Sequence, residues 1–228
     1  MPNRTVLFQL KVVLNHVKPL IWRRIIVPGD FTVRQLHTVL QVVMGWEESH
    51  LHVFKIQEKE YGDPQDDETG RHPIFDEHKY RLDRILPKQV GFRFTYTYDF
   101  GDEWEHVLLI EKVLPIDEGI NRPVCLAGQR ASALEDSGGP LGYMELLETL
   151  KNPASPDYEE QREWAGEDFN PETFDLNAVT QQLNRLVDAD YQLETLFDFE
   201  DDELDELGGV SSAPAAQQNG AYYKVIDR

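Results

Sequence analysis

The sequence predicts an α+β protein, with a mixed or antiparallel sheet of about five strands, one helix packed after the second strand, and helices and an acidic tail toward the C-terminus. Two observations support this fold class. Apolar residues alternate at every second position through much of the first half of the chain, which is typical of half-buried strands, whereas helical spacing follows residue 141. Strands and helices do not alternate strictly, which disfavours a doubly wound parallel sheet.

Five segments carry the strand pattern. Residues 5–14 alternate apolar and polar side chains, and a second strand is predicted over 21–27 after a break at a proline. Residues 51–57 predict a third strand. The strongest hairpin signal comes last, because 92–98 and 104–110 alternate on either side of an Asp-Phe-Gly-Asp turn.

The helix after the second predicted strand has a clear beginning and end. Thr32 and Gln35 form a capping box, in which each side chain satisfies a free backbone N–H of the first turn, and Gly45 ends the helix. Two further helices are predicted, one from Leu141 onward and one that opens near Asp175.

The chain divides into a predicted α+β domain over 1–190 and an acidic, largely disordered tail over 191–228. The segment Asp198–Glu206 holds seven acidic residues in nine. Residues 208–220 are small and polar, and they bury too little apolar surface to offset the entropy lost on ordering.

Charge and composition restrict the class of function. The net charge of −20 repels a phosphate backbone and disfavours non-specific nucleic-acid binding, although it leaves room for a local basic patch. Solubility is the simple explanation of the acidity, and recruitment of a basic protein partner by the tail is the alternative. The longest apolar run, Val107–Ile110, is far too short for a membrane span, and a single cysteine, Cys125, indicates a reducing compartment, so a cytoplasmic location is expected.

Two neighbouring histidines are the first candidates for a site. If 50–57 is extended, His50 and His52 project from one face of the strand, about 6–7 Å apart, and two imidazoles at that spacing can hold one divalent metal. The alternative is structural, with His52 closing the apolar row of Phe54 and Ile56.

The predicted hairpin turn supplies the second group. Asp99, Asp102 and His106 suit general acid–base work, and His106 can also complete a metal site with His50 and His52. The two aspartates are equally well explained as turn formers that accept backbone N–H bonds. Arg24 is the candidate for binding an anion, with an internal ion pair as the alternative.

Taken together and in order, several strings resemble the plasmid pRiA4b ORF-3-like family. The strings are Pro19–Ile25 (PLIWRRI), Leu36-His37 with Met44-Gly-Trp46, Ser49–His52 (SHLH), Tyr96–Asp102 (YTYDFGD) with Trp104-Glu-His106, and Glu135–Pro140 (EDSGGP) with Gly142-Tyr143. The resemblance spans about residues 5–188 and leaves the acidic tail outside.

The resemblance implies an α+β fold found on plasmids, mobile elements and chromosomes, without an accepted biochemical activity. Many members place additional cysteines in the loop that here carries Cys125, Ser132 and Ser137, so this chain lacks the thiolates for a metal site there. Two hypotheses of function follow. The favoured one is a non-enzymatic binding or regulatory module, and the alternative is a metal-dependent hydrolase or nuclease-like enzyme that uses the His/Asp cluster.

Overall fold

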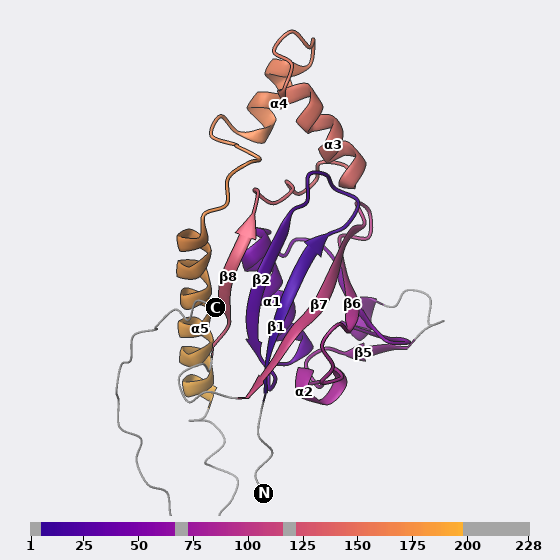
Figure 1. Cartoon of the computed structure of the whole chain (residues 1–228), viewed down its shortest axis with the longest axis vertical. Helices are drawn as coiled ribbons and strands as arrows, with labels where there is room; N and C mark the ends of the chain where they lie inside the picture. The colour runs from indigo at the N-terminus through magenta and orange to yellow at the C-terminus, as the bar shows by residue number, and fades with distance from the viewer. Residues whose placement is uncertain (1–5, 67–72, 116–121, 198–228) are drawn as a thin grey trace, which may run out of the picture.

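The computed structural model describes residues 6–66, 73–115 and 122–197. Of the predicted tail over 191–228, residues 191–197 belong to the last helix, and 198–228 lie outside the described residues. One sheet organises the described residues, with the strand order β5-β4-β3-β6-β7-β1-β2-β8 (Figure 1). The strands are β1 (Val6–Leu14), β2 (Trp22–Pro28), β3 (His52–Ile56), β4 (Lys59–Gly62), β5 (Ile74–Asp76), β6 (Arg93–Tyr98), β7 (Trp104–Pro115) and β8 (Val124–Gln129). The helices are α1 (Val33–Met44), α2 (Leu82–Ile85), α3 (Gly139–Leu150), α4 (Tyr158–Ala165) and α5 (Leu176–Phe197), with a short 3-10 turn over Pro64–Asp66.

The predicted α+β class is confirmed, but the sheet has eight strands rather than about five. The strands that sequence analysis missed, β4, β5 and β8, lie at the two edges of the sheet. β4 and β5 have only four and three residues, and β8 (VCLAGQ) shows no clear alternation of apolar and polar side chains. The sheet is mixed, since β4 and β5 pair in parallel while the remaining pairs are antiparallel.

Helix α1 follows β2 as predicted, and its ends form as the sequence indicates. The Thr32 hydroxyl accepts the Gln35 N–H while the Gln35 side chain accepts the Thr32 N–H, and Gly45 ends the helix in the left-handed region with φ of 66°. Apolar side chains of α1 such as Leu36 and Leu40 are fully buried against the sheet. Capping and an apolar stripe together explain why this segment is the central helix of the core.

The two faces of the sheet differ in what covers them. The inner face packs on α1, and α5 contacts both α1 and the edge strand β8 (Figure 1). Along β1, Phe8, Leu10 and Val12 point into the core, whereas Lys11 and Val13 lie on the opposite, outer face and are half-buried. An antiparallel sheet commonly packs one face on a core and leaves the other to solvent.

Three loops meet at one end of the sheet, here called the loop end: residues 46–51, 99–103 and 131–138. The start of α3 sits tightly on the turn between β6 and β7, because a Cβ added at Gly139 would come 2.4 Å from the Asp102 carbonyl oxygen. Gly139 also has φ of 69°, so glycine meets both a steric and a conformational need there. Within the described residues, no helix is long and apolar enough to cross a membrane.

Candidate functional site

His50 and Asp99 meet because their strands are neighbours. The register pairs His52 of β3 with Tyr98 of β6, so the residues just before β3 and just after β6 lie side by side. The Asp99 N–H donates to the Leu51 carbonyl at 2.8 Å, and Nδ1 of His50 lies 3.6 Å from Oδ2 of Asp99. A predicted metal ligand and a predicted catalytic carboxylate are therefore brought together by sheet pairing.

Asp136 joins this pair from the loop before α3. Its Oδ1 lies 3.2 Å from Nε2 of His50, and one ligand atom from each of the three residues falls within 4.8 Å of the others. In the part of the chain that the structure describes, this is the one group of three such side chains at metal-binding spacing. Sequence analysis missed Asp136, because nothing in its own loop links that carboxylate to a histidine far away in the chain.

Both carboxylates of this trio project from unusual backbone positions. Asp99 and Asp136 have φ of 58° and 59°, in the left-handed region that aspartate tolerates better than most residues but that still costs free energy. Oδ1 of Asp99 accepts the N–H groups of Gly101 and Asp102 at 2.9 and 3.3 Å, which leaves Oδ2 to face His50. Asp99 is thus a turn former as well as a member of the trio.

Exposure differs across the trio in a way that suits ligand entry. The side chain of Asp99 is 12% exposed, that of His50 is 28% exposed, and that of Asp136 is 72% exposed. The Nε2 atom of His50 is buried and makes no hydrogen bond within the described residues, although the Asp136 carboxylate is near. Asp99 is therefore held by its turn, whereas the side chain of Asp136 is mostly open to solvent.

Asp102 has a supporting role in this geometry. Its Oδ2 accepts the Gly138 N–H at 3.1 Å, which ties the loop before α3 to the turn between β6 and β7. This bond fixes the approach of Asp136, two residues earlier, to the other members of the trio. Asp102 itself is not one of the residues at metal-binding spacing among those that the structure describes.

His52 does not join His50, and the premise that both histidines project from one strand is wrong, because β3 begins at His52 and His50 lies in the preceding loop. The His52 ring faces inward and stacks on the ring of His37, with centroids 3.5 Å apart and planes at 11°. Its Nε2–H donates to Oε2 of Glu77 at 2.7 Å. His52 therefore belongs to a separate polar network.

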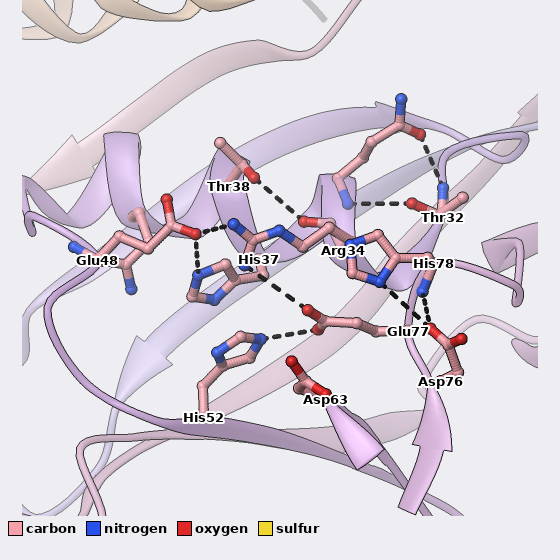
Figure 2. A network of polar contacts seen from close by, with 12 residues as sticks. Thr32, Arg34, His37, Thr38, Glu48, His52, Asp63, Asp76, Glu77 and His78 are labelled. Carbon is pink, nitrogen blue, oxygen red and sulfur yellow. Dashed lines mark hydrogen bonds and ion pairs between the residues drawn. The ribbon is translucent and has the colours of Figure 1, made fainter. Parts of the chain in front are cut away.

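The side chains of that network contact one another between α1 and the sheet (Figure 2). Arg34 pairs with Glu48 on one side and reaches Glu77 at 3.6 Å on the other, while Glu48 lies 3.3 Å from Nε2 of His37. The Glu77 side chain is only 2% exposed, and its charge is offset by Arg34 and by the hydrogen bond from His52. Because these contacts give a buried carboxylate its partners, the network has a structural role.

His37 is neutral in this network. The amide of Gln41 donates to the Tyr96 hydroxyl at 2.9 Å, so the hydroxyl donates its own hydrogen to Nδ1 of His37 at 2.8 Å. Burial, with smaller contributions from His52 and Arg34, lowers the pKa of His37 to about 2. Neither His37 nor Glu77 was predicted as a site residue, since a histidine in an apolar helix stripe looks like core and Glu77 lies in a region predicted to be a loop.

His106 is fully buried on the inner face, away from the trio. Its Nδ1–H donates to the Tyr96 carbonyl at 3.3 Å, and its ring meets the Trp46 ring edge-on with centroids 5.0 Å apart. Burial lowers the pKa of His106 to about 4, so the ring is neutral near pH 7. Neither His106 nor His52 joins a group of three at metal-binding spacing in the described ranges, so the predicted set of His50, His52 and His106 is not assembled.

Arg24 lies on the outer face, and its guanidinium already has a carboxylate partner. Two of its nitrogens donate to the two oxygens of Glu111 at 2.6 and 2.9 Å, and this hydrogen bonding raises the pKa of Arg24. Arg24 thus forms the internal ion pair that is the alternative to anion binding. The guanidinium is not free to take an external anion unless Glu111 moves away.

The trio has the composition of a divalent-cation site. One imidazole nitrogen and two carboxylate oxygens suit zinc, manganese or iron, and a three-residue set leaves coordination positions for water or substrate. In the present arrangement each nitrogen of His50 faces a different carboxylate, so an ion bound at one of these nitrogens would need the other carboxylate to turn toward it.

A family model, a related sequence and a solved structure are similar to this chain over most of its length. The family model described as plasmid pRiA4b ORF-3-like protein matches residues 6–178. The uncharacterized protein y4hQ of Sinorhizobium fredii is 39% identical over 181 residues, which covers 79% of this chain and 90% of that protein. The crystal structure of a protein of unknown function, MM3350 from Methanosarcina mazei Go1, is similar with a TM-score of 0.69 and 39% identity, over 76% of this chain and 97% of that one. The chain belongs to the plasmid pRiA4b ORF-3-like family.

Proposed function

We propose that this chain is a binding module that takes up a divalent cation at His50, Asp99 and Asp136. The observation that carries the proposal is the meeting of three ligand atoms within 4.8 Å of one another. His50 also has an imidazole nitrogen, Nε2, that makes no hydrogen bond among the described residues. A metal ion also binds best where a ligand is held in position beforehand, as Asp99 is by the hydrogen bonds of its turn.

The consequence of cation binding follows from where the ligands sit, and it is regulatory in kind. His50 precedes β3, Asp99 follows β6 and Asp136 precedes α3, so one ion would tie three separate loops together. Without the ion, mutual repulsion between the Asp99 and Asp136 carboxylates favours separation of these loops. Cation concentration would then set the shape of the loop end.

A titration tests the cation site directly. Chelator-treated protein is titrated with Zn²⁺, Mn²⁺, Mg²⁺ and Ca²⁺ by calorimetry, alongside His50→Ala and Asp99→Asn. At least one cation should bind with a stoichiometry of one, and each variant should bind it at least about tenfold more weakly, since loss of even an outer partner of a metal site costs ~10–100-fold. Asp99→Asn keeps a side-chain oxygen for the turn, so it separates loss of charge from loss of fold.

His78→Ala is the matched control. His78 is an exposed histidine with an aspartate neighbour, Asp76, at 3.2 Å, but it has no third ligand at metal-binding spacing among the described residues. This variant should bind the cation as the unaltered chain does. Equal cation affinity in the unaltered chain and in His50→Ala would show that the trio is an ion-paired cluster and no cation site.

Metal-assisted hydrolysis is the second candidate, and one observation favours it. The trio supplies three ligands, and a bound zinc with three protein ligands keeps a fourth position for a water whose pKa it lowers to ~7. The test is release of nitrophenolate from a nitrophenyl phosphodiester in the presence of the cation that binds. Turnover that disappears in His50→Ala but persists in His78→Ala supports an enzyme. Turnover that is equal in both variants contradicts it.

A further inference from the structure

The outer face of the sheet carries a charge pattern opposite to that of the whole chain. Strand register places Arg93, Leu109, Lys11 and Arg24 in one row across β6, β7, β1 and β2. Between this row and the loop end, Lys55 of β3 pairs with Thr95 of β6. The outer-facing positions of these five strands hold the cations Lys11, Arg24, Lys55, Arg93 and Lys112 and the carboxylates Glu105 and Glu111, and Glu60 of β4 lies opposite Lys55.

The cations outnumber the carboxylates on this face, whereas the chain as a whole has 22 basic and 42 acidic residues. Arg24 is paired with Glu111, but Lys11, Lys55 and Arg93 have no ion-pair partner within 4.0 Å among the described residues. Lys11 instead lies over the Trp22 ring, 5.1 Å from its centroid. Three unpaired cations on one face of a strongly acidic chain call for a negatively charged occupant.

The centre of the outer face is apolar. Val13, Val107 and Leu109 are half-buried and pack outside the core cluster, and Trp22 lies beside them in the same row as Val13. An occupant that complements both the cations and the apolar centre of this face is therefore acidic, with interspersed apolar side chains. A nucleic acid meets only the charge requirement, and the net charge of the chain repels it at long range.

The chain contains such a segment. Asp198–Glu206 reads DFEDDELDE, with seven carboxylates and the apolar residues Phe199 and Leu204. It follows directly on α5, which ends at Phe197 and contacts the edge strand β8 (Figure 1). Nine extended residues span up to ~30 Å, and the five strand intervals from β8 to β3 span ~24 Å. The segment is long enough to cross the whole basic row.

We propose that Asp198–Glu206 docks on the outer face of the sheet in the same molecule, over Lys11, Arg93 and Lys55. Attachment to α5 supplies a high effective concentration, so a weak complementary contact suffices. The docked segment covers the exposed cations and the apolar centre, and it competes with any external polyanion for them. This docking surface is independent of the cation site at the loop end.

Zero-length carbodiimide cross-linking of the full chain tests the docking. The reagent joins a lysine to a carboxylate only when the two are in contact, and mass spectrometry identifies the pairs. Cross-links from Lys11 and Lys55 to residues 198–206 should be several-fold more abundant than those from Lys18, an exposed lysine in the turn between β1 and β2. They should fall at 1 M salt, where the Debye length is ~3 Å. Equally abundant cross-links from Lys11, Lys55 and Lys18 to residues 198–206 overturn the proposal.

The double variant Lys55→Glu/Arg93→Glu gives a second measurement. Both residues are exposed, so the fold is retained, and the cross-link at Lys11 should fall several-fold because the segment loses its binding partners. An unchanged Lys11 cross-link overturns the proposal. Binding of a single-stranded oligonucleotide gives a third measurement. If it binds the full chain as tightly as a chain with the acids of 198–206 changed to amides, the face accepts external polyanions and is not masked by the segment.

Discussion

Residues of the same type have different environments on the two faces of the sheet, and the neighbours Arg23 and Arg24 show this most clearly. Arg23 points inward, is 2% exposed, and donates to backbone carbonyls such as that of Val43 at 2.8 Å and to the Ser132 hydroxyl. Arg24 points outward and pairs with Glu111. Burial lowers the pKa of Arg23 to about 10, whereas the hydrogen bond to Glu111 raises the pKa of Arg24.

The histidines extend this contrast. His37 and His106 lie on the inner side, are fully buried and are held neutral by burial, which leaves them structural roles. His50, two residues before β3, lies at the loop end between two carboxylates and is partly open to solvent. The chemistry available to a histidine in this fold therefore depends on whether its side chain is buried in the core or lies at the loop end.

The largest effect is expected on the inner side. His37→Ala removes the acceptor of the Tyr96 hydroxyl and leaves a space beside His52, so it should lower the free energy of unfolding by ~3 kcal/mol. Urea denaturation measures this loss. Adding Tyr96→Phe removes the hydroxyl that has lost its acceptor. The loss of unfolding free energy in the double variant should therefore be smaller than the sum of the losses in the two single variants. Strict additivity would contradict the proposed hydrogen-bond pair.

A smaller effect on the same side depends on pH. Below the ordinary histidine pKa of 6.5, His106 takes up a proton in the unfolded chain, whereas the folded protein resists protonation down to about pH 4, because burial lowers the pKa of this ring. Stability should therefore be unaffected by His106 above pH 6.5 and fall as pH decreases from 6.5 to 4, at ~1.4 kcal/mol per pH unit. This amounts to ~2 kcal/mol at pH 5.

His106→Leu isolates that contribution. Thermal or urea unfolding of the two proteins is compared at pH 7 and pH 5, and the variant should lose ~2 kcal/mol less than the unaltered chain over this interval. The same pH dependence in both proteins would mean that His106 does not supply it.

The smallest effect is expected on the outer face. Arg24→Gln breaks the pair with Glu111, and because both side chains are partly exposed, the cost should stay below ~1 kcal/mol and shrink with added salt. Arg23→Met, one residue earlier, should cost more than ~2 kcal/mol because it strands buried carbonyl oxygens. Equal losses for the two arginine variants would remove the distinction between the faces.

The parts of the fold that sequence predicted well are those set by neighbours in the chain. Thr32, Gln35 and Gly45 marked the ends of α1 correctly, because caps depend on backbone groups within one turn. The central strands were visible because each buries one face and therefore alternates. β4, β5 and β8 were missed, because they are short or lack alternation and become regular only through their pairing in the sheet.

The sequence by itself determined the alternation that sends Arg23 and Arg24 to opposite faces, the capped helix, the absence of internal disulfides and the acidic segment after α5. These features depend on residue type and short spacing. Tertiary structure alone decided that His50, Asp99 and Asp136 converge while His52 and His106 turn into the core. The physical reason is that strand order and register, rather than position along the chain, set which loop ends lie within ligand distance of one another.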